Sequence, residues 1–368
     1  MYTLEKKQPA FRSVEKSFGW PLLEDHKATS RLTVIVPAYN EAQSIADTIR
    51  SLQAQTVLAE EIIVVDDFST DATGDVARSC GVTVIRPSQN TGSKAGAQNF
   101  ALQYVNTEFT MAIDADTTLA PDAIEKFLRA FDDDKLAAAC GFVIPRYVRT
   151  LWERGRYIEY LFAFTFFKPI QDYYDKPLIS SGCFSMYRTA ILKENGGWST
   201  RTLAEDMDLT WSFYQAGYRV RFVGDALCYP IEPHNFTFMR KQLKRWSHGF
   251  IQNVKLHWKG ILHIHYLRSI VAVALWDAVI ASLAYLVLLP ILAVLLRNPY
   301  FLLGYIIDIP VVLVPTLVCA IPRKEFWQVI FSIPAFFVLR TVNSVFILEA
   351  IWSEVIQRKS FSVYEKGH

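Results

Sequence analysis

The pattern of hydrophobic positions changes about two-thirds of the way along the chain. Up to residue 268, short apolar runs of strand length alternate with segments in which apolar residues recur every three or four positions. From residue 269 onward, the apolar residues form three long runs. The first pattern is typical of an α/β domain and the second of helices surrounded by hydrocarbon. We therefore expect an α/β domain followed by a membrane region.

The first part of the chain repeats a unit of strand, polar loop and helix. The segments LTVIV, EIIVV, VTVI and FTMAI each predict a strand, and a helical pattern follows each of the first three. Ile45, Ile49 and Leu52 lie on the apolar face of the first predicted helix. Such alternation predicts a mostly parallel sheet with helices on both faces. Because ligands of these sheets bind at the carboxyl ends of the strands, chemistry is expected there.

Polar clusters follow all four predicted strands. They are residues 37–41, Asp66-Asp67, residues 90–94, and Asp114 with Asp116. Carboxylates that share one crevice raise one another's pKa unless a cation or hydrogen-bond donors compensate. Magnesium and manganese ions suit carboxylate oxygens and are often held by one or two of them together with the oxygens of a diphosphate. The clusters therefore predict a divalent-metal site. The glycine-containing loop NTGSKAG matches neither a dinucleotide fingerprint nor a phosphate-binding P-loop.

The three apolar runs span residues 269–296, 300–321 and 326–351. Each exceeds the roughly 20 residues needed to cross a bilayer. A buried core hairpin is the alternative for the first two runs, whereas the third is interrupted by Arg340 and other polar residues. We expect about three transmembrane helices.

These patterns divide the chain into five segments. They are an N-terminal extension (1–30), an α/β domain (31–250), an interfacial linker helix (251–268), a transmembrane region (269–351) and a C-terminal tail (352–368).

The charges near the apolar runs bear on orientation. The first 20 residues contain no apolar stretch of a signal peptide, so the α/β domain of this integral membrane protein is expected to stay in the cytoplasm. Basic residues before the first run and between the second and third agree with this placement. Three spans would put the tail outside, which Arg358, Lys359 and Lys366 oppose. The number of spans and the side of the tail stay open.

Overall charge and cysteine content exclude two classes of site. A net charge of +2 argues against a nucleic-acid surface. The five cysteines are odd in number and lack the spacing of a metal site, so we expect reduced thiols.

Five motifs occur in order over residues 31–250: VPAYNE, VVDDFSTD, the DxD of residues 114–116, LAEDMDLT and QLKRW. In this order they resemble the inverting nucleotide-sugar glycosyltransferases of family two. The last motif resembles the QxxRW of membrane-bound polysaccharide synthases such as cellulose, chitin and hyaluronan synthases. The resemblance implies a GT-A fold, with a Rossmann-like sheet flanked by helices. It also implies a nucleoside-diphosphate sugar donor, most often UDP, and Mn²⁺ or Mg²⁺ as cofactor.

The resemblance also assigns donor-binding residues. These are Ala38, Tyr39, Glu41, Asp66, Asp67, Lys94, Asp114, Asp116 and Arg245. Within the DxD motif, Asp116 is implied as the metal ligand and Asp114 as a contact on the ribose or sugar side. Arg245 is suited to neutralising the departing diphosphate. A strand-end aromatic that closes the core is the alternative for Tyr39.

Asp206 matches the catalytic base of the family. Inversion by direct displacement needs a carboxylate that takes the proton of the attacking acceptor hydroxyl. Glu205 and Asp208 lie close by in the sequence and are rivals for this role. Capping of the following helix is the alternative interpretation of Asp208.

The acceptor is expected to lie beside small and aromatic residues. Ser181, Gly182 and Cys183 occupy the place of the family's acceptor segment, and Gln242 and Trp246 share one face of a predicted helix. An interfacial basic helix is an alternative, compatible interpretation of the last motif. Residues 156–169 and 250–266 are aromatic enough to lie on the bilayer or to pack in the core. For the two histidines that flank the last motif, His234 and His248, we expect a solvated or diphosphate-facing position, with a metal-ligand role as the alternative.

The number of spans guides the expected reaction. Processive synthases that secrete a polymer have more spans, some of them before the catalytic domain. We therefore favour transfer to a lipid-linked or glycolipid acceptor in the bilayer. The alternatives are a processive polysaccharide synthase, in which a homo-oligomer supplies the missing helices, and an inactive scaffold that keeps the fold.

Overall fold

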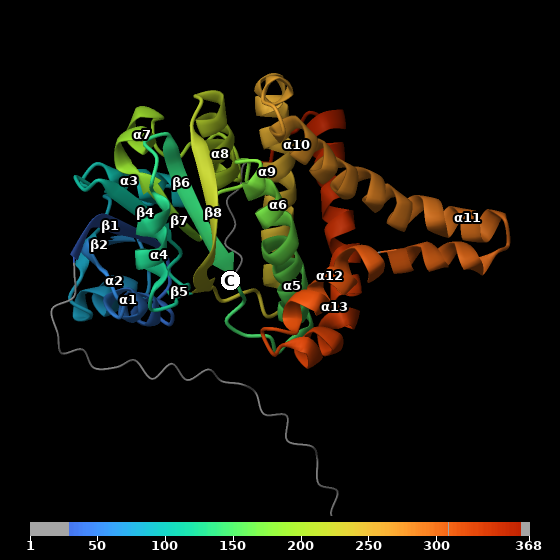
Figure 1. The fold of residues 1–368 in the computed structure, drawn as a ribbon, viewed down its shortest axis with the longest axis horizontal. Coiled ribbons are helices and arrows are strands. Elements are labelled where there is room, and N and C mark those ends of the chain that lie inside the picture. Colours follow the sequence, from blue (N-terminus) through green and yellow to red (C-terminus); the bar gives the residue numbers. More distant parts are fainter. Residues whose placement is uncertain (1–28, 308, 362–368) are drawn as a thin grey trace, which may run out of the picture.

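The computed structural model describes residues 29–307 and 309–361. Most of the predicted N-terminal extension and the end of the predicted tail, including Lys366, lie outside the described residues. An α/β domain forms one side of the molecule, and long helices extend from the other side (Figure 1).

The α/β domain is built on one sheet, in which the described residues form eight strands. The strands are β1 (Thr29–Ala38), β2 (Leu58–Asp66), β3 (Thr83–Ile85), β4 (Phe109–Ile113), β5 (Thr118–Leu119), β6 (Leu136–Val143), β7 (Phe184–Arg188) and β8 (Arg219–Tyr229). Their order is β3-β2-β1-β4-β7-β6-β8-β5. The four predicted strands, β1 to β4, pair in parallel. The sheet is mixed because β7 runs antiparallel to both β4 and β6, and β5 runs antiparallel to β8.

Helices cover both faces of the sheet, as the alternating pattern predicts. They are α1 (Ile45–Gln53), α2 (Thr73–Ser79), α3 (Lys94–Leu102), α4 (Ala123–Ala130), α7 (Thr189–Glu194) and α8 (Glu205–Gln215). Val34 and Val36 of β1 belong to one core, whereas Ile35 between them belongs to the other. Neighbouring side chains of a strand point to opposite faces, so β1 is buried on both.

Three further helical segments lie between the sheet and the apolar helices (Figure 1). They are α5 (Leu151–Phe162), which continues through the π-helical turn η1 (Ala163–Phe167) into α6 (Lys168–Tyr173), and α9 (Phe236–His263). A capping box starts α5: Thr150 Oγ1 accepts a hydrogen bond from Glu153 N, and Glu153 Oε2 accepts one from Thr150 N at 2.8 Å. This reciprocal pair satisfies amide groups that a helix start leaves without partners.

Three helices of the described chain are long and apolar enough to cross a membrane: Leu267–Leu295, Pro299–Ala320 and Phe326–Ile356. Their segments are α10 (Leu267–Leu275), η2 (Trp276–Ala281), η3 (Ala284–Leu288), α11 (Leu289–Leu295), η4 (Pro299–Ile307), η5 (Ile309–Leu313), α12 (Val314–Ala320), α13 (Phe326–Ile351) and η6 (Trp352–Ile356). The first two form a hairpin that projects from the body, whereas α13 lies against it (Figure 1). Only 11% of the most apolar window of the first helix is buried, against 39% for the third. The alternative of a buried core hairpin is therefore wrong.

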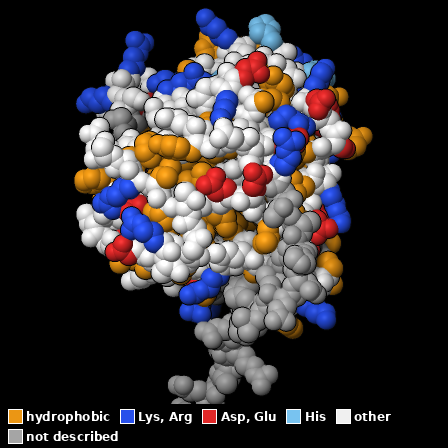
Figure 2. All heavy atoms as spheres, turned by 90° about the vertical axis from the view of Figure 1, so that its left-hand side faces the viewer, with side chains coloured by type: hydrophobic (Ala, Val, Ile, Leu, Met, Phe, Trp, Pro, Cys, Tyr) orange, Lys and Arg blue, Asp and Glu red, His pale blue; other side chains and the backbone are white. Residues whose placement is uncertain are grey.

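The surface of the α/β domain carries both signs of charge. On the face turned away from the apolar helices, Lys and Arg side chains are interspersed with Asp and Glu (Figure 2). All five cysteines are free thiols, and Cys140 and Cys228 are buried in the core.

Candidate functional site

One cavity of about 340 Å³ lies at the carboxyl ends of the parallel strands, and helices α5 and α9 close its far side. This volume is in the range of small-molecule sites. Many of the predicted site residues line it: Ala38, Tyr39, Glu41, Asp67, Lys94, Asp114, Asp116, Cys183, Gln242, Arg245 and Trp246. The structure thus brings together residues that follow four different strands, as the strand-end argument predicts. Their individual roles stay predictions.

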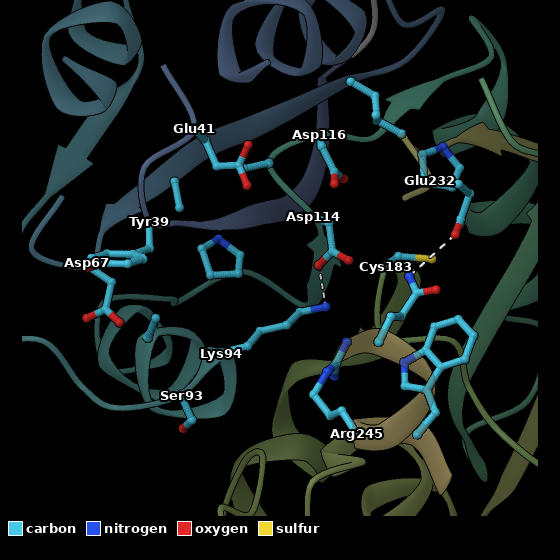
Figure 3. A pocket seen from close by; sticks show the side chains of 18 of the residues that line it. Tyr39, Glu41, Asp67, Ser93, Lys94, Asp114, Asp116, Cys183, Glu232 and Arg245 are labelled. Carbon is cyan, nitrogen blue, oxygen red and sulfur yellow. Dashed lines mark hydrogen bonds and ion pairs between the residues drawn. The ribbon is translucent and has the colours of Figure 1, made fainter. Parts of the chain in front are cut away.

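Tyr39 and Asp67 lie at one end of the cavity (Figure 3). The Asp67 carboxylate accepts hydrogen bonds from Thr91 N at 2.8 Å and Thr91 Oγ1 at 2.9 Å. Burial raises the pKa of Asp67, and the Thr91 hydrogen bonds oppose this. Tyr39 is 40% exposed, so it does not close the core.

Asp66 differs from its neighbour, because it is not among the residues that line the cavity. Its carboxylate accepts hydrogen bonds from Arg86 and from Ser69 N. Burial of the side chain is thereby compensated within the protein. The structure gives Asp66 a role in holding the loop after β2, and its role in donor binding stays a prediction.

Glu41 is held by the loop that follows β1. Its side chain is buried and accepts a hydrogen bond from Ser44 Oγ at 2.5 Å. Its backbone N donates to Thr73 Oγ1 at 2.7 Å. Just before it, Asn40 takes a positive φ of 54°, a conformation that asparagine tolerates better than most residues. The sharp turn brings Glu41 to the cavity.

The centre of the cavity contains Lys94 and the two DxD carboxylates (Figure 3). Lys94 Nζ forms an ion pair with Asp114 and donates a hydrogen bond to Gly182 O at 3.0 Å. Asp116 is buried, and its backbone O accepts a hydrogen bond from Arg146 Nη2 at 3.0 Å. Lys94 therefore compensates part of the negative charge of the DxD carboxylates, for which the sequence predicted a metal ion.

The start of α3 adds a second feature that suits an anion. Ser93 caps this helix by accepting a hydrogen bond from Gly96 N at 3.1 Å. Ser93 and Lys94 both line the cavity. The amide groups of a helix N-terminus favour negatively charged ligands.

The described residues contain no group of three His, Cys, Asp or Glu side chains that could hold a metal ion by themselves. The Asp114 and Asp116 carboxylates do fit an ion that binds one or two carboxylates and completes its coordination shell with ligand oxygens and water, as Mg²⁺ does. Asp114 and Asp116 both point into the cavity (Figure 3). Because Asp114 is paired with Lys94, Asp116 is the better match for the metal.

Asp206 and Glu205 lie in the first turn of α8 and are not among the residues that line the cavity. Asp206 Oδ2 accepts a hydrogen bond from Gly182 N at 2.8 Å. Gly182 thus joins Asp206 to Lys94, and its neighbour Cys183 belongs to the cavity wall. Burial and the adjacent Asp206 raise the pKa of Glu205, while Lys94 and Arg245 oppose this.

Asp208 is fully buried in an ion-pair network of its own. It accepts a hydrogen bond from His257 Nε2 at 2.6 Å and two from Arg201, at 2.8 and 2.7 Å. Although burial acts to raise it, these partners hold the pKa of Asp208 at about 2. The capping interpretation is wrong: Ala204 is the N-cap residue of α8, and Asp208 lies inside the helix.

Two polar residues of the cavity were not predicted from the sequence. Tyr160 comes from α5, in a run that we assigned to the bilayer or the core, and Glu232 precedes α9. The Glu232 carboxylate lies near Gln242, whose Nε2 donates to Glu232 Oε2 at 3.4 Å (Figure 3). Burial, together with Glu232, raises the pKa of Tyr160. No motif or spacing marked Glu232.

Other predicted residues lie outside the cavity. Ser181 Oγ accepts a hydrogen bond from Lys168 Nζ at 3.0 Å. His248 is buried against Glu354 at 3.0 Å, so the solvated or diphosphate-facing position expected for it is wrong. His234 Nε2 lies 3.1 Å from Asn235 Nδ2 at the start of α9.

Residues 33–196 match the model of glycosyl transferase family 2. The chain is similar to the poly-beta-1,6-N-acetyl-D-glucosamine synthase of Staphylococcus epidermidis, with 27% identity over 242 residues, covering 64% of this chain and 58% of that protein. The synthase of Staphylococcus aureus strain COL is 27% identical over 223 residues, covering 59% of this chain and 54% of that protein. The chain therefore spans little more than half the length of these relatives.

A mannosyltransferase from Pyrobaculum calidifontis, solved in complex with GDP-Man and Mn²⁺, has a similar structure. The TM-score is 0.57 at 18% identity, and the similarity covers 94% of this chain and 92% of that one. At this identity the likeness shows the fold, here the GT-A fold. The sheet, the five ordered motifs and the family match agree: residues 33–196 are similar to glycosyl transferase family 2, and the chain has a GT-A fold followed by long apolar helices.

Proposed function

We propose that the protein is a membrane-anchored, metal-dependent inverting glycosyltransferase. It transfers a sugar from a nucleoside-diphosphate sugar, with UDP-hexose as the first choice, to a lipid-linked or glycolipid acceptor at the cytoplasmic face of the membrane. The observation that supports this most is the course of the cavity. It begins at the strand ends with Tyr39 and Asp67 and ends at Gln242 and Trp246 of α9, a helix that packs against α13.

The proposed donor site follows this course. Tyr39 and Asp67 hold the nucleoside, and the start of α3 with Lys94 and Arg245 surrounds the diphosphate. Asp116 would hold the divalent cation, which supplies positive charge to the departing diphosphate. The buried carboxylates and the helix start give this region the mixture of charges that a metal diphosphate needs.

Asp206 is the proposed base. It takes the proton of the acceptor hydroxyl as the hydroxyl oxygen bonds to the anomeric carbon, and the bond from that carbon to the diphosphate oxygen breaks on the opposite side. Gly182 N holds one carboxylate oxygen of Asp206 in place. Arg245 stabilises the charge that develops on the leaving diphosphate.

The second candidate is a processive polysaccharide synthase that acts as an oligomer. Two observations favour it: the similarity to the two staphylococcal synthases, and the mostly exposed hairpin of the first two apolar helices, which other copies could cover. An inactive scaffold is disfavoured, because Asp116, Asp206 and Arg245 are all retained.

A panel of nucleotide sugars tests the proposal. The purified protein in detergent, with Mn²⁺ or Mg²⁺ and a membrane lipid extract, should release nucleoside diphosphate from one donor of the panel. Removal of the metal with EDTA should stop the release, and the Asp206→Asn variant should lose at least about 100-fold in rate. Unchanged turnover in Asp206→Asn would overturn the assignment of the base. Sizing the product separates a single transfer from polymerisation.

A further inference from the structure

We propose that Arg156 is a positioning residue that holds the acceptor end of the cavity in shape and connects it to the third apolar helix. This inference rests on the proposed function, because it concerns the end of the cavity where the acceptor would bind. Arg156 belongs to α5, and no motif of the sequence includes it.

The guanidinium of Arg156 contacts three side chains that line this end. Its Nη2 donates a hydrogen bond to Gln242 Oε1 at 2.8 Å, and its Nε lies 3.6 Å from Glu232 Oε2. Its carbon atom lies 4.6 Å from the centre of the Trp246 ring, a cation–π distance. One planar group therefore fixes the amide, the carboxylate and the indole relative to one another.

Because Arg156 and Glu232 are buried, loss of their mutual contact would be costly. The Arg156 side chain is 3% exposed, and so is that of Glu232. Two buried charges without each other would be strongly unfavourable, whereas a paired and hydrogen-bonded set is tolerated. Burial acts to lower the pKa of Arg156, but the carboxylates of Glu159 and Glu232 raise it, so the guanidinium stays charged.

The same arginine is tied to the membrane side of the molecule. Its Nη1 contacts Glu159 Oε2 at 2.6 Å, and the other oxygen of Glu159 accepts a hydrogen bond from Asn343 of α13. Next to Arg156, Gly155 lets the two helices approach closely: a Cβ at that position would lie 2.9 Å from Ala335 O. A continuous set of contacts thus runs from α13 through Glu159 and Arg156 to the cavity.

Lysine should not replace this arginine. Guanidinium presents a rigid planar fork that serves several partners at once and stacks on aromatic rings, whereas an ammonium is a single point charge. In Arg156→Lys the charge remains, but Gln242 and Trp246 lose their common support. The donor end keeps its own contacts, such as those of Asp67 with Thr91.

The test measures acceptor use and donor binding separately, because each reports on one end of the cavity. For wild type and Arg156→Lys, transfer from the active nucleotide sugar is followed while the donor and a membrane lipid extract are varied in turn. Binding of UDP and GDP with Mn²⁺ is measured by calorimetry. In Arg156→Lys we expect the apparent KM for the lipid acceptor to rise by about tenfold or more. The KM for the donor and the nucleotide affinity should stay within about twofold of wild type.

Arg188→Lys is the matched control. Arg188 also pairs with a carboxylate, Glu108 at 3.3 Å, and lies over an aromatic ring, Phe109 at 5.5 Å, but it is outside the cavity. The Arg188→Lys variant should have the same acceptor KM as wild type. If Arg156→Lys loses nucleotide binding because it misfolds, Asn343→Ala tests the same contacts from α13, and the acceptor KM should then rise by about threefold.

The outcomes are distinct. The inference is overturned if the acceptor KM of wild type equals that of Arg156→Lys, or that of Asn343→Ala where Arg156→Lys misfolds. The proposed function is then left intact. Donor and acceptor KM values that rise together also overturn the inference, because they indicate general loss of structure. A wild type that binds nucleotide but transfers nothing to lipid overturns the proposed function and the inference with it.

Discussion

At the scale of single residues, three acids near the start of α8 differ because their partners differ. Asp206 accepts a hydrogen bond from a backbone amide next to the cavity. Glu205 is buried beside it and has a raised pKa. Asp208 lies in an ion pair with Arg201 and His257. One short motif therefore contains a proposed base, a buried carboxyl group and a structural ion pair.

The ion pair predicts a pH-dependent contribution to stability. The pKa of Asp208 is lowered from 3.8 to about 2 in the folded protein, so ionised Asp208 stabilises the fold above pH 3.8 and this contribution is lost as pH falls towards 2. By linkage it is worth about 2 kcal/mol at neutral pH. We expect Asp208→Asn to lower the free energy of unfolding by about this amount at pH 7, measured by denaturant titration in detergent.

The difference between Asp208→Asn and wild type should shrink as the pH of the titration falls below 3.8. A difference that stays constant down to pH 2 would contradict the assignment. Nucleotide binding serves as the control, because Asp208 lies outside the cavity.

The strand-end residues of the site could be predicted because the carboxyl ends of parallel strands meet at one edge. Glu41, Asp67 and Asp116 were expected together for this reason, and all three line the cavity. The ion pair of Lys94 with Asp114 and the position of Glu232 could not be predicted. Both depend on the relative placement of segments far apart in the chain, for which the local pattern has no signal.

At the scale of elements, α13 joins the two parts of the molecule by packing against α5 and α9. Tyr157 of α5 donates a hydrogen bond to Glu325 Oε2 at 3.1 Å, just before α13 begins. Helices α5 and α13 approach closely at Gly155, where an added Cβ would also meet Leu339 Cβ at 2.9 Å. The backbone of α13 cannot move aside as a flexible side chain can.

We therefore expect Gly155→Ala to separate these helices and to destabilise the protein by about 1 to 3 kcal/mol, the usual cost of overpacking. A lower midpoint of thermal unfolding in detergent is the readout. Gly224→Ala on β8 is the matched control, because its Cβ would meet only the edge of the Phe222 ring at 3.1 Å. Equal unfolding midpoints for the two variants would show that the close approach of α5 and α13 at Gly155 does not contribute to stability.

The elements themselves were largely predictable. Strands β1 to β4 correspond to short apolar runs, helix α1 follows a hydrophobic period of 3.6 residues, and Ile45, Ile49 and Leu52 are fully buried. The antiparallel insertion of β7 was not predicted, since pairing direction depends on the connections and not on the period. Residues 156–169 show a similar limit: Arg156 and Phe164 are buried while Phe166 is exposed.

At the scale of the whole molecule, the three apolar helices lie on the side opposite to β1, β2 and β3 (Figure 1). Large side chains of the first two are exposed along their length, among them Trp276, Leu295 and Val318. Such a surface is stable only in an apolar environment. We expect the bilayer to supply it, with the α/β domain on the cytoplasmic side.

Thiol labelling tests this orientation. Cys80 follows α2 on the α/β domain and is partly exposed. In a variant with Cys183 and Cys319 replaced by alanine, we expect a membrane-impermeant maleimide to label Cys80 only after the cells are permeabilised. Labelling of Cys80 in intact cells would place the domain outside, where cytoplasmic nucleotide sugars are absent.

The most direct test of the central claim is transfer of label from a nucleotide sugar to lipid. The protein is placed in vesicles that contain the membrane lipid extract, and the donor identified by the panel is supplied with a labelled sugar and Mn²⁺. We expect label in the organic phase for wild type and at least about 100-fold less for Asp206→Asn. Label that appears only as a long water-soluble polymer, or equally in both proteins, would contradict this claim.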